Sequence, residues 1–519
     1  MTMPVATGSQ MREIDRITID ERGIPGITLM ENAGQGVAHA VRKYLGPLHD
    51  KNIVVVCGKG NNGGDGMVVA RLLSKECPSL QIFLLADEKE LKGDALENYR
   101  RARTEEIRVA ELKNSKDLIG KSLGNLEEAD IIIDAIFGTG INGPVKGFYG
   151  EVIELINRTS AKVVSIDVPS GLSSDSGEVF EPAVHAFMTV TLGLPKVSSI
   201  VYPAASLYGH LEIADIGIPD EVVKGTSFNI NLIEKEDVAS LIPVRQRDAH
   251  KGDFGHLLIV GGSPGKSGAV IMAANAALRS GAGLVTVVVP QSLDMVMECG
   301  LLEAMSLSLP ETEDGTLSPK GVKQFLQFAK NKSVIAIGPG IGTNNETLEF
   351  LSSILSSVDI PVVLDADAIN LVAKNPEILK NTKAEIVITP HPGEMARLAG
   401  IQSSEVQARR LEICNEVASK YNVTVVLKGK NSIISKCGRF AYINPTGNPG
   451  MASGGSGDVL TGVIAGLISQ KIEPGDAAYA GTYIHGLAGD MAASATGEIS
   501  LIARDIIEYI PEAIKECLK

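Results

Sequence analysis

Residues 444–462 read NPTGNPGMASGGSGDVLTG, a glycine-dense loop that runs without a break into an apolar helix and carries a single acid, Asp458. Five glycines fall within the fifteen residues that end at Asp458. The backbone can therefore adopt positive φ angles and turn its N–H groups toward one point. The unpaired N–H groups and the dipole at the start of the helix also favour negative charge. The stretch predicts a loop that holds a phosphate or a developing oxyanion.

The position of Asp458 indicates the kind of chemistry. A carboxylate beside an anion site repels phosphate unless it has a task, such as taking a proton from a hydroxyl. The combination favours phosphoryl transfer to an alcohol, with Asp458 as the base. The alternative is that Asp458 only caps the helix, as aspartate often does. A cap alone does not explain the upstream glycines.

The length and charge of the chain limit its architecture and its partners. Its 519 residues exceed one ordinary core, so we expect at least two domains. Acids outnumber bases by 62 to 48, a net charge of −14, which argues against nucleic acid or an anionic membrane as the main partner. No apolar run approaches the roughly 20 residues of a membrane span. The start of the chain carries no signal or transit pattern, so we expect a soluble cytoplasmic protein.

Apolar, strand-like runs alternate with helical patterns in both halves of the chain. This order predicts an α/β fold with parallel strands buried on both faces. Residues 218–252 are polar and lack a sustained strand and helix rhythm. We therefore place a junction near residues 228–234 and expect one domain at 1–228 and a second at 234–519. The expected strands are NIVVVCG, QIFLLAD, ADIIIDAIFG, AKVVSIDV, FMTVTLG, GHLLIVGG, GLVTVVVP, SVIAIGPG, IPVVLDAD, AEIVITP and VTVVLKG.

Two glycine motifs resemble common nucleotide-binding loops. In the first half, Gly58, Gly60 and Gly63 formally satisfy GxGxxG, and Asp87 follows the next strand. The motif continues into NNGGDG, however, whose two amides and one carboxylate are surplus to a pyrophosphate turn. We interpret it either as a plain strand-to-helix turn or as a loop for a more specific ligand. In the second half, GGSPGKSG at 261–268 does not meet the GxxxxGK[ST] spacing of a Walker loop.

Further polar clusters follow predicted strands, at the edge where open α/β sheets bind ligands. An acid in such a place can bind a cation or serve as an acid or base. Each cluster alone is more typical of a helix cap or a turn. In the first half they are Asp134 with GTGINGP and Asp167 with DVPSGL. In the second half they are GPGIG, LDADAIN (Asp365, Asp367, Asn370), TPHPGE (His391, Glu394) and LKGKNS.

Taken together, the motifs resemble those of a known pair of families. GKGNNGGDG, DAIFGTGINGP and SIDVPSGL, preceded by MREIDRITIDERGIPGITLMENAG, resemble the YjeF N-terminal, or NAD(P)H-hydrate epimerase, family. HKGDFGHLLIVGGSPGKSGA, GPGIG, LDADAIN, TPHPGE, LKGKNS and NPGMASGGSGDVLTG are similar to the ADP/ATP-dependent NAD(P)H-hydrate dehydratase family. The order is that of the fused bifunctional NAD(P)H-hydrate repair enzymes. The resemblance implies an N-terminal Rossmann-like three-layer domain followed by a ribokinase-like α/β domain.

For the first half, the resemblance implies interconversion of the R and S forms of NADH and NADPH that carry water at C6 of the nicotinamide ring. Asp167 is the candidate for handling the proton. A potassium ion is expected at Asn62, Asp134 and Ser170. The implied contacts with the damaged nucleotide are Asn61, Asn62, Gly63, Gly64, Asp65, Gly138, Thr139, Gly140, Ile141, Asn142, Gly143, Pro144 and Asp167.

For the second half, the resemblance implies dehydration of the S form at the expense of ADP or ATP, accompanied by Mg²⁺. Asp458 takes the proton from the C6 hydroxyl as that oxygen attacks the terminal phosphate, and phosphate then leaves. Hydrated substrate is expected at Gly340, His391 and Asp458. The implied nucleotide-binding residues are Lys428, Gly429, Lys430, Asn431, Ser432, Gly454, Gly455, Ser456 and Gly457.

Two other functions stay open at this point. The C-terminal loop and Asp458 would also serve a ribokinase-like kinase of a vitamin or thiazole alcohol, with the first half as its ligand-sensing domain. In a second alternative, the first half is a non-catalytic sensor or interaction module. Neither explains the NNGGDG, GTGINGP and DVPSGL set as well as the repair function does. The resemblance also leads us to expect a homo-oligomer.

Overall fold

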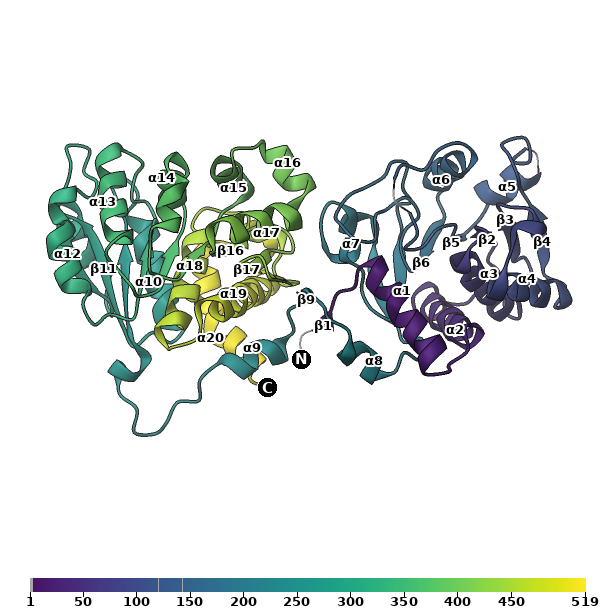
Figure 1. Ribbon diagram of the computed structural model, residues 1–519, viewed down its shortest axis with the longest axis horizontal. Helices are drawn as coiled ribbons and strands as arrows, with labels where there is room; N and C mark the ends of the chain where they lie inside the picture. The colour runs from purple at the N-terminus through teal and green to yellow at the C-terminus, as the bar shows by residue number, and fades with distance from the viewer. Residues whose placement is uncertain (1–2, 120, 142) are drawn as a thin grey trace. The chain divides into compact units, whose positions relative to one another are not determined.

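A computed structural model describes residues 3–119, 121–141 and 143–519 of the chain (Figure 1). The chain separates into two compact units, one of residues 4–228 and one of residues 229–519 with Met3. We describe each unit by itself. In the described part of the chain, no helix combines the length and the apolar character that crossing a bilayer requires.

Within the described residues, the N-terminal unit holds a seven-stranded sheet in the order β4-β3-β2-β5-β6-β7-β8. The neighbouring strands are parallel. The central β2 and β5 are buried along their whole length, as expected for apolar runs covered on both faces. The strands are β2 (Ile53–Cys57), β3 (Gln81–Leu84), β4 (Arg108–Glu111), β5 (Ile131–Ala135), β6 (Lys162–Ile166), β7 (Met188–Leu192) and β8 (His210–Ala214).

Helices cover both faces of this sheet (Figure 1). Val55 and Ile133 pack with α2, α3 and α4, whereas the alternate residues Val54 and Ile132 pack with α5 and α6. The predicted three-layer arrangement is therefore confirmed. The helices are α1 (Gly8–Arg16), the π-helix η1 (Ile17–Glu21), α2 (Gly26–Leu45), α3 (Asn61–Ser74), η2 (Glu88–Glu90), α4 (Gly93–Thr104), α5 (Lys121–Glu127), α6 (Phe148–Arg158), α7 (Val197–Ile200), η3 (Ala204–Leu207) and α8 (Asp220–Gly225).

The C-terminal unit is built on an eleven-stranded sheet, counted over the described residues, in the order β1-β9-β18-β17-β16-β15-β14-β13-β10-β11-β12. Strands β10 to β16 pair in parallel where they adjoin, and all of them except β12 were predicted. The strands are β1 (Met3–Pro4), β9 (Ile230–Leu232), β10 (His256–Val260), β11 (Leu284–Pro290), β12 (Met305–Leu309), β13 (Val334–Ile337), β14 (Val362–Leu364), β15 (Ile386–Ile388), β16 (Thr424–Leu427), β17 (Ile433–Lys436) and β18 (Phe440–Ile443).

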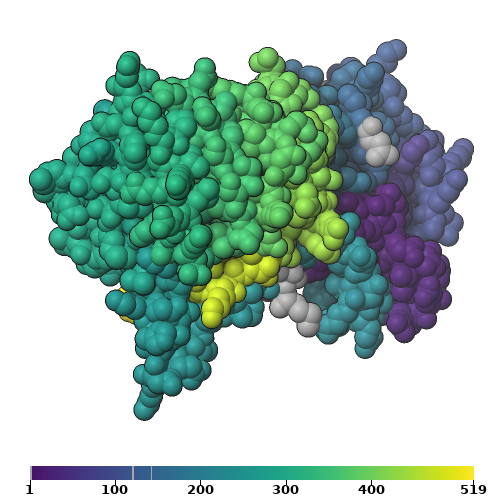
Figure 2. All heavy atoms as spheres, turned by 60° about the vertical axis from the view of Figure 1, so that its left-hand side comes forward, coloured from purple at the N-terminus to yellow at the C-terminus, as the bar shows by residue number. Residues whose placement is uncertain are grey.

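Two features of this sheet differ from the sequence-based expectation. β17 pairs antiparallel with β16 and with β18, so this end of the sheet is not parallel. β9 pairs with β18 and lies inside residues 218–252, which the sequence indicated to be without regular structure. In the sequence, β9 lies between two short helices, α8 (Asp220–Gly225) and α9 (Lys235–Leu241). Residues 244–248, which follow α9, form an exposed connection that projects from the C-terminal unit (Figures 1 and 2).

The helix that carries Asp458, α18, is buried on nearly every side, as predicted. It crosses α10 closely at Gly462, where an added Cβ would come within 2.2 Å of the Ala273 carbonyl oxygen. Helices α10, α18, α19 and α20 share one hydrophobic core. The helices are α9 (Lys235–Leu241), η4 (Lys251–Phe254), α10 (Ser267–Arg279), η5 (Gln291–Leu293), α11 (Asp294–Gly300), η6 (Pro319–Gly321), α12 (Val322–Ala329), α13 (Asn345–Leu355), α14 (Asp367–Lys374), η7 (Pro376–Lys380), α15 (Pro392–Ala399), α16 (Ser403–Ala408), α17 (Arg410–Tyr421), η8 (Pro449–Met451), α18 (Ser456–Ser469), α19 (Pro474–Thr496), η9 (Glu498–Ser500) and α20 (Ala503–Cys517).

Candidate active sites

A cavity of about 580 Å³ opens in the N-terminal unit where β2, β5 and β6 end. This edge is where open α/β sheets bind their ligands. Side chains from α1 and α2, among them Met11 and Asp15, close it from another side. Seven residues predicted to contact substrate line the cavity: Asn61, Asn62, Asp65, Gly138, Thr139, Gly140 and Asp167.

Other predicted substrate residues do not line this cavity. Gly63 lies in the first turn of α3, where an added Cβ would come within 2.0 Å of the Gly58 carbonyl oxygen. Gly64 similarly packs on Met30. Glycine at these two positions lets α3 pack closely against Gly58 and Met30. Close packing therefore explains both glycines without a ligand. Of the remaining loop, Ile141, Gly143 and Pro144 are not on the wall, and Asn142 lies outside the described residues.

Asp134, at the end of β5, is fully buried and surrounded by donors. Its carboxylate accepts hydrogen bonds from Ser170 Oγ at 2.6 Å, Ser170 N at 2.9 Å, Ser165 Oγ at 2.8 Å and Ile136 N at 3.3 Å. Burial raises the pKa of Asp134, while these hydrogen bonds act in the opposite direction. The carboxylate thereby fixes the DVPSGL loop after β6 to the end of β5.

Asn62 joins the same network through the backbone of Phe137. Asn62 Nδ2 donates to Phe137 O at 2.8 Å, and Phe137 N donates to Ser170 Oγ at 2.9 Å. The predicted potassium ligands Asn62, Asp134 and Ser170 are thus brought together. Their donors are oxygens, which suit a hard cation. Among the described residues, no cluster of three or more His, Cys, Asp and Glu side chains could hold a metal ion.

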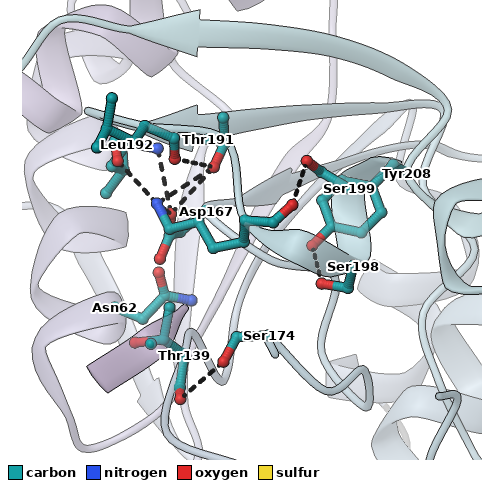
Figure 3. Close-up of polar contacts among 12 residues, drawn as sticks. Asn62, Thr139, Asp167, Ser174, Thr191, Leu192, Ser198, Ser199 and Tyr208 are labelled. Atoms are coloured by element: carbon teal, nitrogen blue, oxygen red, sulfur yellow. Dashed lines mark hydrogen bonds and ion pairs between the residues drawn. The ribbon is translucent and has the colours of Figure 1, made fainter. Parts of the chain in front are cut away.

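Asp167 follows β6, and hydrogen bonds hold one of its two carboxylate oxygens (Figure 3). Its Oδ1 accepts from Leu192 N at 3.1 Å, from Thr191 Oγ1 at 3.3 Å and from Lys196 Nζ. Lys196 is only 1% exposed. Figure 3 shows Asp167 between the Thr191–Leu192 end of β7 and Asn62. The sequence predicted Asp167 but missed Lys196, whose one signal is its place just after the TVTLG strand.

Two more acids face the same cavity. Burial raises the pKa of Asp65 well above its usual range, and the nearby carboxylates of Asp167 and Asp15 raise it further, against the effect of Lys196. Burial also raises the pKa of Asp15, which Lys196 opposes and Asp167 supports. With Asp94 and Asp167, four acids line the cavity, together with the bases Arg12, Lys59 and Lys196. An acid with a raised pKa can give a proton to a leaving group.

In the C-terminal unit, Lys428 and Asp365 form a buried ion pair at the ends of β16 and β14. Lys428 Nζ lies 2.7 Å from Asp365 Oδ1 and 4.0 Å from Glu394 Oε2. Burial acts to lower the pKa of Lys428, but Asp365, Glu394 and Asp458 outweigh it and the pKa is raised. Lys428 therefore presents a permanent positive charge within the polar cluster. Gly457 adjoins it, because a Cβ there would lie 3.3 Å from Lys428 Nζ.

Asp458 is the third residue of α18 and does not cap the helix. The N-cap is Gly455, at a φ of 94° that favours glycine. Within the described residues, the Asp458 carboxylate has no hydrogen-bond partner. Burial, with Asp365 and Asp367 adding to it and Lys428 opposing, raises the pKa of Asp458 to about 7. The alternative that Asp458 only caps the helix is therefore wrong. Asp458 instead places a carboxylate with a raised pKa at the end of the glycine loop.

The remaining predicted substrate residues lie in two other loops of this unit. His391 caps α15: its Nδ1 accepts from Gly393 N at 3.0 Å and its backbone N donates to Glu394 Oε2 at 2.9 Å. About half of the His391 side chain is exposed. Gly340 O accepts from Ser263 Oγ at 2.7 Å. These contacts hold both loops, and His391 Nε2 lies 3.3 Å from Glu394 Oε1.

The GGSPGKSG loop serves the same region although it is not a Walker loop. Lys266 Nζ lies 3.0 Å from Asp367 Oδ2, which also accepts from Gly342 N at 3.1 Å. Lys266 precedes α10 directly and remains half exposed. Its ion pair with Asp367 ties the loop to LDADAIN.

Sequence reasoning missed three supporting residues. Thr461 Oγ1, on the apolar face of α18, donates to Asp365 Oδ2 at 2.8 Å. His485 Nε2 donates to Ser456 O at 3.0 Å, and burial lowers the pKa of His485 to about 4, so it is neutral. Buried Arg410 packs on Gly429, where an added Cβ would meet its Nη1 at 2.7 Å. An apolar helix pattern gives no sign of such polar contacts.

The chain is similar to known proteins along nearly its full length. The profile of the family described as YjeF-related protein N-terminus matches residues 26–198, and that described as NAD(P)H-hydrate dehydratase matches residues 257–512. The bifunctional NAD(P)H-hydrate repair enzyme of Moorella thermoacetica is 42% identical over 99% of this chain and 97% of its own length. Its namesake from Thermofilum pendens is 38% identical over 99% and 96%. A solved ADP/ATP-dependent NAD(P)H-hydrate dehydratase from Bacillus subtilis, co-crystallised with ATP/Mg²⁺, is 28% identical with a TM-score of 0.49, over 56% of this chain and 100% of its own.

Proposed function

The chain belongs to the family of bifunctional NAD(P)H-hydrate repair enzymes, and on that premise we propose that it restores hydrated NADH and NADPH in two steps. The N-terminal unit interconverts the R and S hydrates at C6 of the nicotinamide ring. The C-terminal unit removes the hydroxyl of the S hydrate with ADP or ATP. The predicted fold class, a Rossmann-like three-layer domain followed by a ribokinase-like α/β domain, is confirmed.

Epimerisation needs the C6 hydroxyl to leave and water to return on the other face. The hydroxyl departs as water once it is protonated, and the lone pair of the adjacent ring nitrogen stabilises the resulting cation. Water then adds to C6 and gives a proton to a base. Asp167 suits this last role because, within the described residues, one of its oxygens accepts no hydrogen bond. Asp65 and Asp15 supply the proton for the departing hydroxyl, since burial raises the pKa of both and favours their protonated forms.

Dehydration needs a better leaving group than hydroxide. We assign to Asp458 the removal of the proton from the C6 hydroxyl while that oxygen attacks the terminal phosphate. Lys428 and the backbone amides of the glycine loop, residues 454–457, stabilise the charge of the transferred group. Phosphate then leaves from C6 and the ring double bond is restored. Bound Mg²⁺ would neutralise charge on the nucleotide phosphates.

The proposed residues for nucleotide, substrate and cation follow the same geometry. The LKGKNS segment and Gly457 hold the nucleotide next to the Lys428–Asp365 pair. Gly340, His391 and Asp458 hold the hydrated ring. Asn62, Asp134 and Ser170 hold potassium; the proposal is supported by the hydrogen bonds that join Asn62 Nδ2 to Phe137 O, Phe137 N to Ser170 Oγ and Ser170 Oγ to Asp134 Oδ1. A cytoplasmic location and a homo-oligomer stay predictions.

The observation that carries this function is the unpaired carboxylate of Asp458 beside a cation and a glycine loop. The test is the near-ultraviolet absorbance of reduced nicotinamide, after a mixed-epimer preparation of hydrated NADH receives the protein, Mg²⁺ and ADP or, separately, ATP. Recovery of the whole pool is expected. Recovery of the S fraction alone would remove the epimerase assignment. No recovery with either nucleotide would favour the kinase of a vitamin or thiazole alcohol.

A further inference from the structure

The two carboxylate oxygens of Asp167 differ in their hydrogen bonds. Its Oδ1 accepts all three of its hydrogen bonds, from Leu192 N, Thr191 Oγ1 and Lys196 Nζ. Within the described residues, Oδ2 has no hydrogen-bond donor. Because Asp167 also lines the cavity, one oxygen is consumed by the protein while the other remains free for a ligand.

The backbone conformation of Asp167 indicates that the surrounding residues hold it in this orientation. Its φ is +67°, in the left-handed region that residues other than glycine seldom occupy. Such a conformation is unfavourable and persists only where its surroundings hold it. The hydrogen bond of 2.8 Å from Asp167 N to Val190 O and the three donors on Oδ1 supply that restraint. Lys196 contributes the one positive charge among them.

Lys196 is placed to hold Asp167 and not to react. An ammonium has three donors, and Lys196 Nζ directs them to Asp167 Oδ1, to Leu192 O at 2.7 Å and to Thr191 Oγ1 at 3.2 Å. Its main chain is held too, since Ser199 Oγ donates to Lys196 O at 2.7 Å (Figure 3). No donor is left over for a substrate.

We propose that Lys196 is the positioning residue of the epimerase site: it binds one oxygen of Asp167, so that the other oxygen faces the cavity and accepts the proton of the incoming water. Asp65 or Asp15, which line the same cavity, gives one proton to the departing hydroxyl, and Asp167 takes one proton from the water that replaces it. The number of protons is unchanged, and exchange through solvent returns both acids to their starting forms. This inference rests on the proposed epimerase function. It adds a residue that the sequence did not single out.

The test measures epimerisation of purified R hydrate by chromatography, in an Asp458→Asn background that cannot consume the product. Lys196→Met, which keeps the bulk of the side chain but removes the charge, should lower kcat at least a hundredfold and change KM less than threefold. A residue that only supports the fold would instead change KM or the melting temperature without this selective loss of kcat. A kcat within threefold of the parent overturns the inference.

A second pair of variants keeps the test decisive if Lys196→Met folds poorly. Thr191→Val removes a neutral donor to the same oxygen and should lower kcat several-fold at constant KM. In the double variant Asp167→Asn/Lys196→Met the buried charges are removed together, and its kcat should equal that of Asp167→Asn alone, because both act through one carboxylate. Additive losses, or an unchanged Thr191→Val, overturn the inference. A parent protein that epimerises nothing refutes the proposed function instead.

Discussion

Each unit buries one lysine–aspartate pair where parallel strands end, yet the two pairs leave different groups free. In the N-terminal unit, Lys196 binds Asp167 on Oδ1, and no described residue donates to Oδ2. In the C-terminal unit, Asp365 accepts from Lys428 and Thr389 on Oδ1 and from Thr461 on Oδ2. Asp365 is thus saturated and Asp167 is not.

The difference teaches that a buried ion pair does not by itself identify a catalytic acid. What matters is whether an oxygen of the pair remains free. Asp167 can accept a proton itself, whereas Asp365 can only hold Lys428 in place. The C-terminal unit therefore needs a second carboxylate, and Asp458 lies beside the pair without any partner among the described residues.

The largest expected effect comes from Asp458→Asn, which keeps the shape of the side chain but removes the base. We expect dehydration of S hydrate to fall by roughly a hundred- to ten thousand-fold, the usual range for a general base. Recovery of reduced nicotinamide absorbance measures it. The reciprocal control is Asp167→Asn, which should retain dehydration of S hydrate and lose conversion of R hydrate. If both variants lost both activities, the division of labour would be wrong.

Asp365→Asn tests the structural role of the Lys428–Asp365 pair by its effect on the stability of the C-terminal unit. The change leaves the buried Lys428 without its closest counter-charge, which should cost the C-terminal unit about 3 kcal/mol. We place it at the lower end of the range because Glu394 lies 4.0 Å from Lys428 and 20% of the lysine side chain is exposed. Denaturant unfolding checks it, and adding Lys428→Met should restore part of the loss. A stable single variant would show that the pair is not what holds Lys428.

The pH dependence of dehydration should distinguish Asp458, whose carboxylate is free, from Asp365, which is paired with Lys428. The raised pKa of Asp458, about 7, means that the base is half protonated near neutral pH. A base works only when deprotonated, so kcat/KM for S hydrate should rise through pH 7, level off above it and fall by about tenfold per unit below it. Initial rates across pH measure this. Asp367→Asn removes one charge that raises the pKa of Asp458 and should move the midpoint down; an unmoved midpoint contradicts the assignment.

The smallest expected effect is that of Gly457→Ala in the anion loop. The new methyl group would lie 3.3 Å from Lys428 Nζ and 3.8 Å from Asp365 Oδ2. The lysine must shift slightly, so we expect the KM for ADP or ATP to rise by roughly three- to tenfold. Gly454→Ala is the matched control, since nothing lies within 4 Å of its added Cβ. Equal effects of the two changes would mean that the Lys428 contact is irrelevant.

The fold was largely predictable because its strands are apolar runs of buried residues. The predicted runs correspond to β2, β3, β5, β6 and β7 in the first unit and to β10, β11 and β13–β16 in the second. β9 was missed because it has three residues in a polar stretch and depends on β18, far along the chain. The antiparallel turn from β16 to β17 likewise depends on tertiary pairing.

The acids of the candidate sites were predictable where they followed a strand or, for Asp458, a glycine loop. Asp134, Asp167 and Asp365 stood out for that reason. Lys196 did not, because its role depends on β7 lying next to β6 and on burial, which a lone lysine does not signal. Thr461 was hidden in an apolar helix. Partners supplied by a neighbouring strand or helix require the fold before they can be recognised.

The close crossing of α18 over α10 has a consequence for the motion of the catalytic acid. With Gly462 against the Ala273 carbonyl, the two helices cannot slide apart without breaking the core they share. Amide protons in the middle of α18 should therefore exchange with deuterium only when the whole C-terminal unit unfolds. The loop that leads to Asp458 is anchored as well, since Gly447 N and Asn448 Nδ2 donate to the two carboxylate oxygens of Asp490 on α19. The base is therefore held in place from the helix side and from the loop side.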